Sequence, residues 1–148
     1  MKSAGTAISK KGVRTGYVLT SLAVVFMLFD SVTKLLQVDA VIKASAQLGY
    51  SAGQVFAVGA ILFGCIILYV IPRTAVFGAV LITGYLGGAV EANFHAGTPA
   101  FSNALFPVYF AVIVWGGIYL RERRIRDIVP FRTFRKQGND LTEGKAAA

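Results

Sequence analysis

The segment TAVFGAVLITGYLGGAVEANFHAG, residues 74–97, sets the class of protein to which this sequence belongs. It begins as an apolar, glycine-rich run typical of helices that pack against one another inside a bilayer. It ends with Glu91 and His95, which are four residues apart and therefore share one face of a helix, one turn apart. Ionisable side chains at membrane depth are rare and costly, so this face is the first candidate for a functional site.

Apolar runs of this kind account for nearly the whole chain. The protein has 148 residues, of which 55% are hydrophobic, and its mean hydropathy is +0.64. Charged residues are nearly absent from four runs of about 18 to 20 residues, a length that crosses a bilayer core of about 30 Å. We therefore predict an all-α integral membrane protein, a four-helix transmembrane bundle with both termini cytoplasmic. No segment is left over for a soluble catalytic module.

The boundaries of the helices follow from the residues that interrupt the apolar runs. Gly49 and Ser51 mark a turn and a helix cap, and Pro72 with Arg73 marks a sharp break. The predicted membrane helices cover about residues 13–36, 52–71, 74–95 and 104–120, with a short amphipathic helix at 40–48. In terms of domains, we expect a basic N-terminus (1–14), the transmembrane domain (15–120) and a tail that is basic and amphipathic and then disordered (121–148).

Two finer predictions concern the third membrane helix and the connection that follows it. Gly84 and Gly88 form a GxxxG pair, which we expect to pack closely against another helix of the same chain rather than form a dimer. In the connection, Asn103 is the expected N-cap of the fourth helix. Pro107 falls in the first turn of that helix, where its missing N–H costs least.

The charge distribution predicts the orientation and the partners. The formal net charge is +8 and the pI is about 9.9. The basic residues flank the apolar runs and gather on one side, which the positive-inside rule makes cytoplasmic. The densest cluster, residues 121–136, predicts a tail that lies on the bilayer surface and is attracted to anionic lipid. Because the charges are placed beside membrane segments, we expect no nucleic-acid partner.

The predicted topology brings two pairs of ionisable residues to the same, non-cytoplasmic side. Asp30 and Lys34 end the first membrane helix, and Glu91 and His95 end the third. Two asparagines lie nearby in the sequence, and a tyrosine about one and a half turns below Glu91 extends the group inward. The candidate ligand-binding or proton-handling residues are Asp30, Lys34, Tyr85, Glu91, Asn93, His95 and Asn103.

Two interpretations of this polar group stay open. In the first, the charges only compensate one another and close the outer end of the bundle, which contributes little net stability although the loss of one partner is costly. In the second, the group forms one end of an apolar cavity that holds an amphiphile such as a quinone, a sterol-like molecule or a lipid. There, an imidazole beside a carboxylate could pass a proton to the ligand.

Other chemistry has less support. One histidine cannot supply bis-histidine haem ligation, and the paired Glu-x-x-His motifs of di-iron bundles are absent from the sequence, so no metal site is predicted. The single cysteine, Cys65, cannot form an internal disulfide and lies in an apolar run, where a packing role is expected. No catalytic motif is visible, and the sequence leaves open whether the protein is an enzyme.

Four segments carry a resemblance to a known family: FDSVTKLLQ (29–37), LGYS (48–51), GYLGGAVEANFHAG (84–97) and LFPVYFAVIVWGGIYLRERRIRDIVP (105–130). Over residues 16–130 the chain resembles the DoxX-like family of small four-helix membrane proteins. The resemblance implies a bundle in the bacterial inner membrane and a loose association with membrane redox processes, because the namesake branch includes subunits of a thiosulfate:quinone oxidoreductase and some members associate with oxidative-stress complexes. No catalytic motif carries over to a residue of this chain, which also has no cysteine pair for thiol chemistry.

The preferred prediction is a non-enzymatic membrane subunit, or a binder of a small apolar ligand or partner inside the bundle. The alternative is a quinone-linked component of a membrane oxidoreductase complex, in which Glu91 and His95 manage protons at the quinone. The expected ligand is a quinone or a lipid. Besides the lipid bilayer, the candidate partners are a membrane redox subunit and a second copy of this chain.

Overall fold

The computed structural model describes residues 10–122 and residue 125, and every regular element among them is helical. The elements in chain order are α1 (Lys10–Leu35), α2 (Asp39–Gln47), α3 (Ala52–Val70), α4 (Ala75–His95), a π-helical turn η1 (Ala100–Ala104) and α5 (Phe106–Arg121). Much of the predicted basic N-terminus and nearly all of the predicted tail, including its lipid-binding part, lie outside the described residues. Because every element named above is a helix, the all-α fold class is confirmed for the described residues.

Three of the helices are long and apolar enough to cross a membrane: α1, α3 and α4. The fourth apolar helix, α5, is 16 residues long and falls below that length. The helix boundaries agree with the predicted ones to within about three residues. Ser51 begins α3 as expected, because its side chain accepts a hydrogen bond from the Gln54 N–H and the Gln54 side chain accepts one from the Ser51 N–H.

The connection between α4 and α5 differs from the prediction. Asn103 is not an N-cap, because it lies inside η1 and its N–H donates to the Pro99 carbonyl at 3.1 Å. An N-cap residue needs a non-helical backbone and a side chain that accepts from the next turn. Leu105 occupies the N-cap position of α5, without a side-chain cap, and Pro107 lies in the first turn as predicted.

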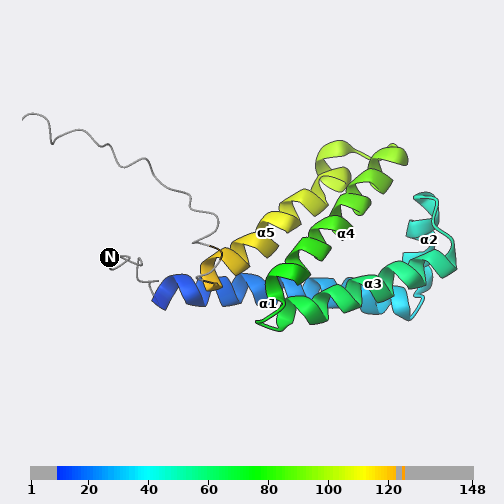
Figure 1. Ribbon diagram of the computed structural model, residues 1–148. Coiled ribbons are helices and arrows are strands. Elements are labelled where there is room, and N and C mark those ends of the chain that lie inside the picture. Colours follow the sequence, from blue (N-terminus) through cyan, green and yellow to red (C-terminus); the bar gives the residue numbers. More distant parts are fainter. Residues whose placement is uncertain (1–9, 123–124, 126–148) are drawn as a thin grey trace, which may run out of the picture.

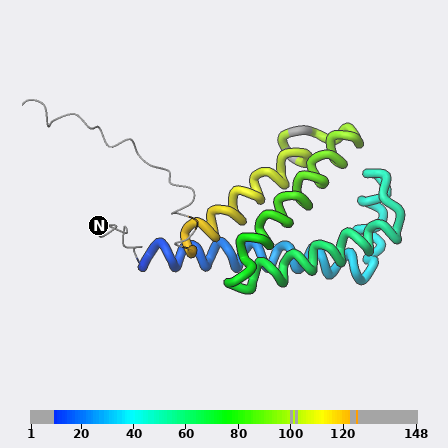
Figure 2. Tube along the Cα trace, in the orientation of Figure 1, coloured from blue at the N-terminus to red at the C-terminus, as the bar shows by residue number. Residues whose placement is uncertain are grey.

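The long helices form two antiparallel pairs, which Figures 1 and 2 show from the side. One pair is α1 with α3, and the other is α4 with α5, which inclines away from the first pair (Figure 1). In addition, α1 packs against α5 and α3 packs against α4. The helices α1 and α4 lie diagonally across the bundle, and within the described residues they share no Cα pair at 8 Å or less.

Glycines allow the close helix crossings, as is common in membrane bundles. At the α1–α5 crossing, a Cβ on Gly117 would lie 2.7 Å from the Thr20 hydroxyl oxygen, and at the α1–α3 crossing a Cβ on Gly59 would lie 2.7 Å from the Lys34 Cβ. At the α3–α4 crossing, a Cβ on Gly78 would overlap the backbone of Tyr69. Each of these crossings therefore requires glycine.

The predicted close contact at the GxxxG pair is wrong. A Cβ on Gly84 or Gly88 would meet no atom within 4 Å, and both residues are exposed. The helix α4 makes its tight contact near its start, at Gly78, and then diverges from α3 (Figure 1). The two later glycines consequently lie beside open space.

Where α1 begins and α5 ends, a charged side chain is buried between aromatic rings. The Arg121 side chain is 7% exposed, and its guanidinium carbon lies 5.7 Å from the centre of the Tyr17 ring and 5.9 Å from that of the Tyr69 ring. Such stacking of a cation on aromatic faces is favourable. The core continues from there along Ala23, Met27, Leu62, Ile82, Val114 and Ile118.

Much of the apolar surface faces outward. Phe29 is 71% exposed and Val112 is 68% exposed, and only 22 to 33% of the most apolar stretch of each membrane-length helix is buried inside the molecule. Soluble monomers rarely expose continuous apolar surface of this extent. A lipid environment accounts for it, since the bilayer core solvates apolar side chains.

Candidate ligand site between the two helix pairs

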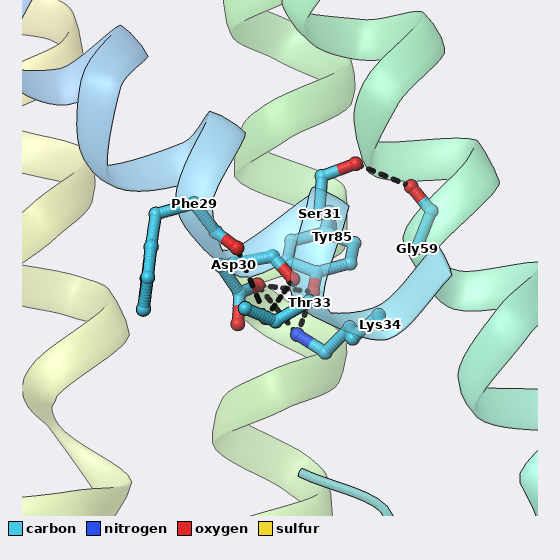
Figure 3. A network of polar contacts seen from close by, with 7 residues as sticks. All are labelled: Phe29, Asp30, Ser31, Thr33, Lys34, Gly59 and Tyr85. Carbon is cyan, nitrogen blue, oxygen red and sulfur yellow. Dashed lines mark hydrogen bonds and ion pairs between the residues drawn. The ribbon is translucent and has the colours of Figure 1, made fainter. Parts of the chain in front are cut away.

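Three polar side chains form a closed hydrogen-bonded triangle between α1 and α4 (Figure 3). The Lys34 ammonium pairs with the Asp30 Oδ2 and also donates to the Tyr85 hydroxyl oxygen at 2.9 Å. The Tyr85 hydroxyl donates to the same Asp30 Oδ2 at 3.2 Å. The triangle therefore joins two helices whose backbones do not touch.

The last turns of α1 hold two members of the triangle in place. Asp30 and Lys34 are one turn apart, which allows a pair on one helix face. Between them, the buried Ser31 donates to the Gly59 carbonyl at 2.9 Å and so fixes α1 against α3 (Figure 3). Thr33 donates back to carbonyls of its own helix. The third member, Tyr85, approaches from α4.

The triangle carries no net charge but retains hydrogen-bonding capacity. Asp30 and Lys34 bear opposite charges, and the exposed fractions of their side chains are 35% and 16%. An ammonium has three donors, of which two are used, and the Asp30 Oδ1 accepts from no described residue. One donor and one acceptor are thus left for a further polar group.

An open cavity of about 360 Å³ lies between α3 and α4, and we call it the α3–α4 cavity. It is mainly apolar, and α2 with the turn after it lies at one end. The residues that line it are Lys34, Ser45, Leu48, Tyr50, Val55, Val58, Ile61, Cys65, Leu81, Gly84, Tyr85, Gly88, Ala89, Ala92 and Asn93.

A second open cavity, of about 480 Å³, lies between α1 with α2 and α4 with α5, and we call it the α1–α5 cavity. Its lining combines aromatic side chains with both charges of the triangle. Its residues are Phe26, Met27, Asp30, Lys34, Ala40, Val41, Ala44, Ser45, Leu48, Leu62, Tyr85, Leu86, Ala89, Asn93, Asn103, Phe106, Pro107 and Phe110. Six residues line both cavities, so the two adjoin: Lys34, Ser45, Leu48, Tyr85, Ala89 and Asn93.

The structure places five of the seven predicted site residues at these cavities. Besides the triangle, Asn93 lines both cavities, donates to the Ala89 carbonyl at 2.8 Å and accepts from the Thr98 hydroxyl at 3.2 Å. Asn103 lines the α1–α5 cavity. Their common position is between the two helix pairs, α1 with α3 and α4 with α5.

The structure does not bring Glu91 and His95 to the triangle. Both are exposed, neither lines either cavity, and neither side chain makes a hydrogen bond or an ion pair with any residue that the structure describes. The expected meeting of the two ionisable pairs is therefore wrong. The reason is the rotation of α4 about its axis, which directs Tyr85 and Asn93 toward the cavities and leaves Glu91 and His95 on the exposed surface.

The contribution of α2 to the site was not predicted from the sequence. Ser45 of α2 and Leu48, the C-cap residue of that helix, line both cavities. The signal was present in the amphipathic pattern of this helix, in which Val41, Ser45 and Leu48 recur at spacings of four and three. Such a pattern indicates that the helix packs one face against another part of the protein, without identifying that part.

The sequence model of the DoxX-like family matches residues 18–117, about two thirds of the chain. The chain belongs to the DoxX-like family. The matched region contains the whole triangle and all the residues that line the two cavities. No curated protein and no solved structure gave a match. The family and the three helices of membrane-spanning length together make this a DoxX-like membrane protein.

Proposed function

We propose that this DoxX-like protein binds a small amphiphile between its two helix pairs, without catalysing a reaction on it. The polar head lies at the triangle of Asp30, Lys34 and Tyr85, and the apolar part lies in the adjoining cavities. One observation carries the proposal: a polar triangle with unused hydrogen-bonding capacity lies where two apolar cavities meet. Their volumes fall within the range of about 300 to 1,000 Å³ that is usual for ligand sites.

The surroundings of the triangle favour this proposal over charge compensation alone. A pair that merely closed the bundle would be expected to have packed neighbours, since interiors leave few voids larger than a water molecule. Here the Lys34 and Tyr85 side chains border open space on two sides. At the opposite end of the bundle, the charged Arg121 side chain is instead buried against the Tyr17 and Tyr69 rings.

The oxidoreductase alternative has less support from the geometry. It assigned proton handling to Glu91 and His95, which lie outside both cavities. A quinone nevertheless fits the triangle as a ligand, because its carbonyl oxygens are neutral acceptors for the free Lys34 donor. We therefore keep quinones among the candidate ligands and do not assign redox chemistry to these residues.

The cellular setting that we propose is a multi-pass protein of the bacterial inner membrane, with four crossings and both termini cytoplasmic. The α1, α3 and α4 helices have membrane-spanning length. The fourth crossing is α5 together with η1, since η1 adds helical backbone before Phe106. Within the described residues, Lys10, Lys11, Arg14 and Arg73 lie at the end of the bundle assigned to the cytoplasm, in agreement with the positive-inside rule.

Extraction of the purified protein tests the proposal. The full chain is purified in detergent from its membrane, extracted with organic solvent and analysed by mass spectrometry for enriched quinones and neutral lipids. We expect one class of amphiphile in the wild-type extract and little of it in the extract of Tyr85→Phe. Tyr109→Phe is the matched control, because the Tyr109 side chain is exposed and lines neither cavity. Equal extracts from all three proteins would contradict the proposal.

A further inference from the structure

We propose that the ligand is an amphiphile with a neutral head and a long chain, which enters sideways from the bilayer and leaves its chain in the α3–α4 cavity beside Gly84 and Gly88. This inference rests on the proposed function, and it adds the ligand class and the route of entry. It follows from how the polar and apolar groups divide between the two cavities.

The neutral head follows from the charges at the site. Asp30 and Lys34 are the charged residues among those that line the two cavities, and they cancel each other. An anionic head at this place would lose its hydration without meeting a net positive charge, which is costly in a partly buried site. A hydroxyl or carbonyl head needs only the free donor of Lys34 or the free acceptor of Asp30.

The direction of the ligand follows from the position of the Asp30 carboxylate. Asp30 and Asn103 line only the α1–α5 cavity, whereas Gly84 and Gly88 line only the α3–α4 cavity. The head therefore lies at the shared border, turned toward Asp30. The chain extends the other way, along the wall between α3 and α4, which has no charged residue other than Lys34 at the border.

The two glycines leave one wall of the α3–α4 cavity without side chains. They are four residues apart, so they share one face of α4, and a Cβ on either would meet no atom within 4 Å. The rim on either side is apolar and open: Ile61 on α3 is 60% exposed and Leu81 on α4 is 37% exposed. Because neither glycine has a side chain, the cavity is open to the side between α3 and α4.

This opening faces the bilayer rather than water. It lies in the middle of α3 and α4, both of membrane-spanning length. Phe77 and Val80, which precede it on α4, are also exposed and apolar. A chain that lies in the opening stays in contact with lipid, so the ligand enters from the membrane without exposing its chain to water.

A binding experiment with matched probes tests the inference. The full chain in lipid nanodiscs is titrated with monodecanoylglycerol, with decanoate, which has the same chain and an anionic head, and with monobutyrylglycerol, which has the same head and a short chain. A quinone with a decyl chain is the second neutral probe, and the tighter binder of the two neutral probes identifies a quinone or a lipid as the source. We expect both neutral ten-carbon probes to bind at least about tenfold more tightly than decanoate, because their heads keep no charge to desolvate. We expect the same margin over the short-chain ester when binding is referred to the free probe in water, because each methylene removed from water contributes to binding.

The variants fill the opening while they leave the helix contacts intact. Gly84→Leu/Gly88→Leu is expected to weaken binding of the neutral ten-carbon probes about tenfold, since the chain loses its place in the cavity. Gly87→Leu is the control on the same helix, because Gly87 is equally open but lines neither cavity, and we expect less than a twofold change. Ile61→Trp narrows the opening from the α3 side and is expected to act in the same direction as the double variant.

The outcomes separate this inference from the proposed function. If no probe binds and Tyr85→Phe changes nothing, the proposed function fails. Suppose that the neutral ten-carbon probes bind and that Tyr85→Phe weakens their binding, but that the double leucine variant binds them as Gly87→Leu does. The proposed function then stands, and the lateral route of entry is overturned. If decanoate binds as tightly as monodecanoylglycerol, the inference that the ligand has a neutral head is overturned.

Discussion

The Tyr85 hydroxyl on α4 lies 3.2 Å from the Asp30 carboxylate oxygen on α1, although the two helices share no Cα pair at 8 Å or less within the described residues. The side chain thus bridges a diagonal of the bundle that the backbones leave open. Lys34 completes the bridge from the α1 side by donating to both oxygens (Figure 3). The part of the bundle that holds this bridge borders two open cavities.

Tyr85→Phe is expected to lower the free energy of unfolding. The change removes one hydrogen bond from the Lys34 ammonium and one to the Asp30 carboxylate while it keeps the ring. Hydrogen bonds to charged groups contribute about 1.5 to 3 kcal/mol, and partial exposure places this case near the lower value. Denaturant unfolding in detergent measures it, with Tyr109→Phe as control. Equal stability of the two variants would show that the bridge does not stabilise the bundle.

The Asp30–Lys34 pair is expected to show compensation in a mutant cycle. Lys34→Ala leaves the carboxylate beside Tyr85 without its cation, and we expect a loss of about 1.5 to 3 kcal/mol. Asp30→Asn/Lys34→Gln removes both charges and keeps polar groups of similar shape, so it is expected to recover more than half of that loss. The measurement is the free energy of unfolding of Lys34→Ala, of the single variants Asp30→Asn and Lys34→Gln, and of the double variant. If the double variant is as unstable as the single ones, the two charges do not compensate each other.

Gly78→Ala is expected to destabilise the protein, whereas Gly87→Ala is not. A methyl group at Gly78 would overlap the Tyr69 backbone, and such overpacking costs about 1 to 3 kcal/mol. At Gly87 the methyl group meets nothing within 4 Å, and the higher helix propensity of alanine contributes about 0.5 to 1 kcal/mol of stability. Melting temperatures in detergent compare the two. A Gly78→Ala protein as stable as the wild type would mean that the α3–α4 crossing adjusts freely.

His95→Ala is expected to change the stability by less than about 0.5 kcal/mol, as exposed substitutions away from contacts usually do. His95 is exposed and makes no hydrogen bond or ion pair within the described residues. Binding of the neutral ten-carbon probes is likewise expected to stay the same. Loss of quinone binding in this variant alone would restore the oxidoreductase alternative.

The proposed topology predicts which residues are accessible from outside the cell. In a Cys65→Ala background, Ala96→Cys is expected to react with a membrane-impermeant thiol reagent in intact cells. Lys11→Cys is expected to react only after the membrane is opened. Both positions are exposed in the structure, so a difference between them reports the side of the membrane. Labelling of both in intact cells would contradict the predicted orientation.

The helices themselves could be predicted from the sequence. Their starts and ends depend on local features, such as the capping pair Ser51 and Gln54 and the helix break at Pro72, and these act through neighbours a few residues away. The apolar composition of each run likewise predicts membrane-length helices without reference to other parts of the chain. The fold class and the family were accessible in the same way.

The rotation and inclination of the helices could not be predicted. Gly84, Gly88, Glu91 and His95 share one stripe of α4, and the sequence marks that stripe as the interesting one. The structure turns a different stripe, with Tyr85 and Asn93, toward α1. The local pattern of a helix that is apolar on all sides does not define an inner face. That face is set by the contact of Gly78 with Tyr69 and by the crossings at Gly59 and Gly117, which involve residues far apart in the chain.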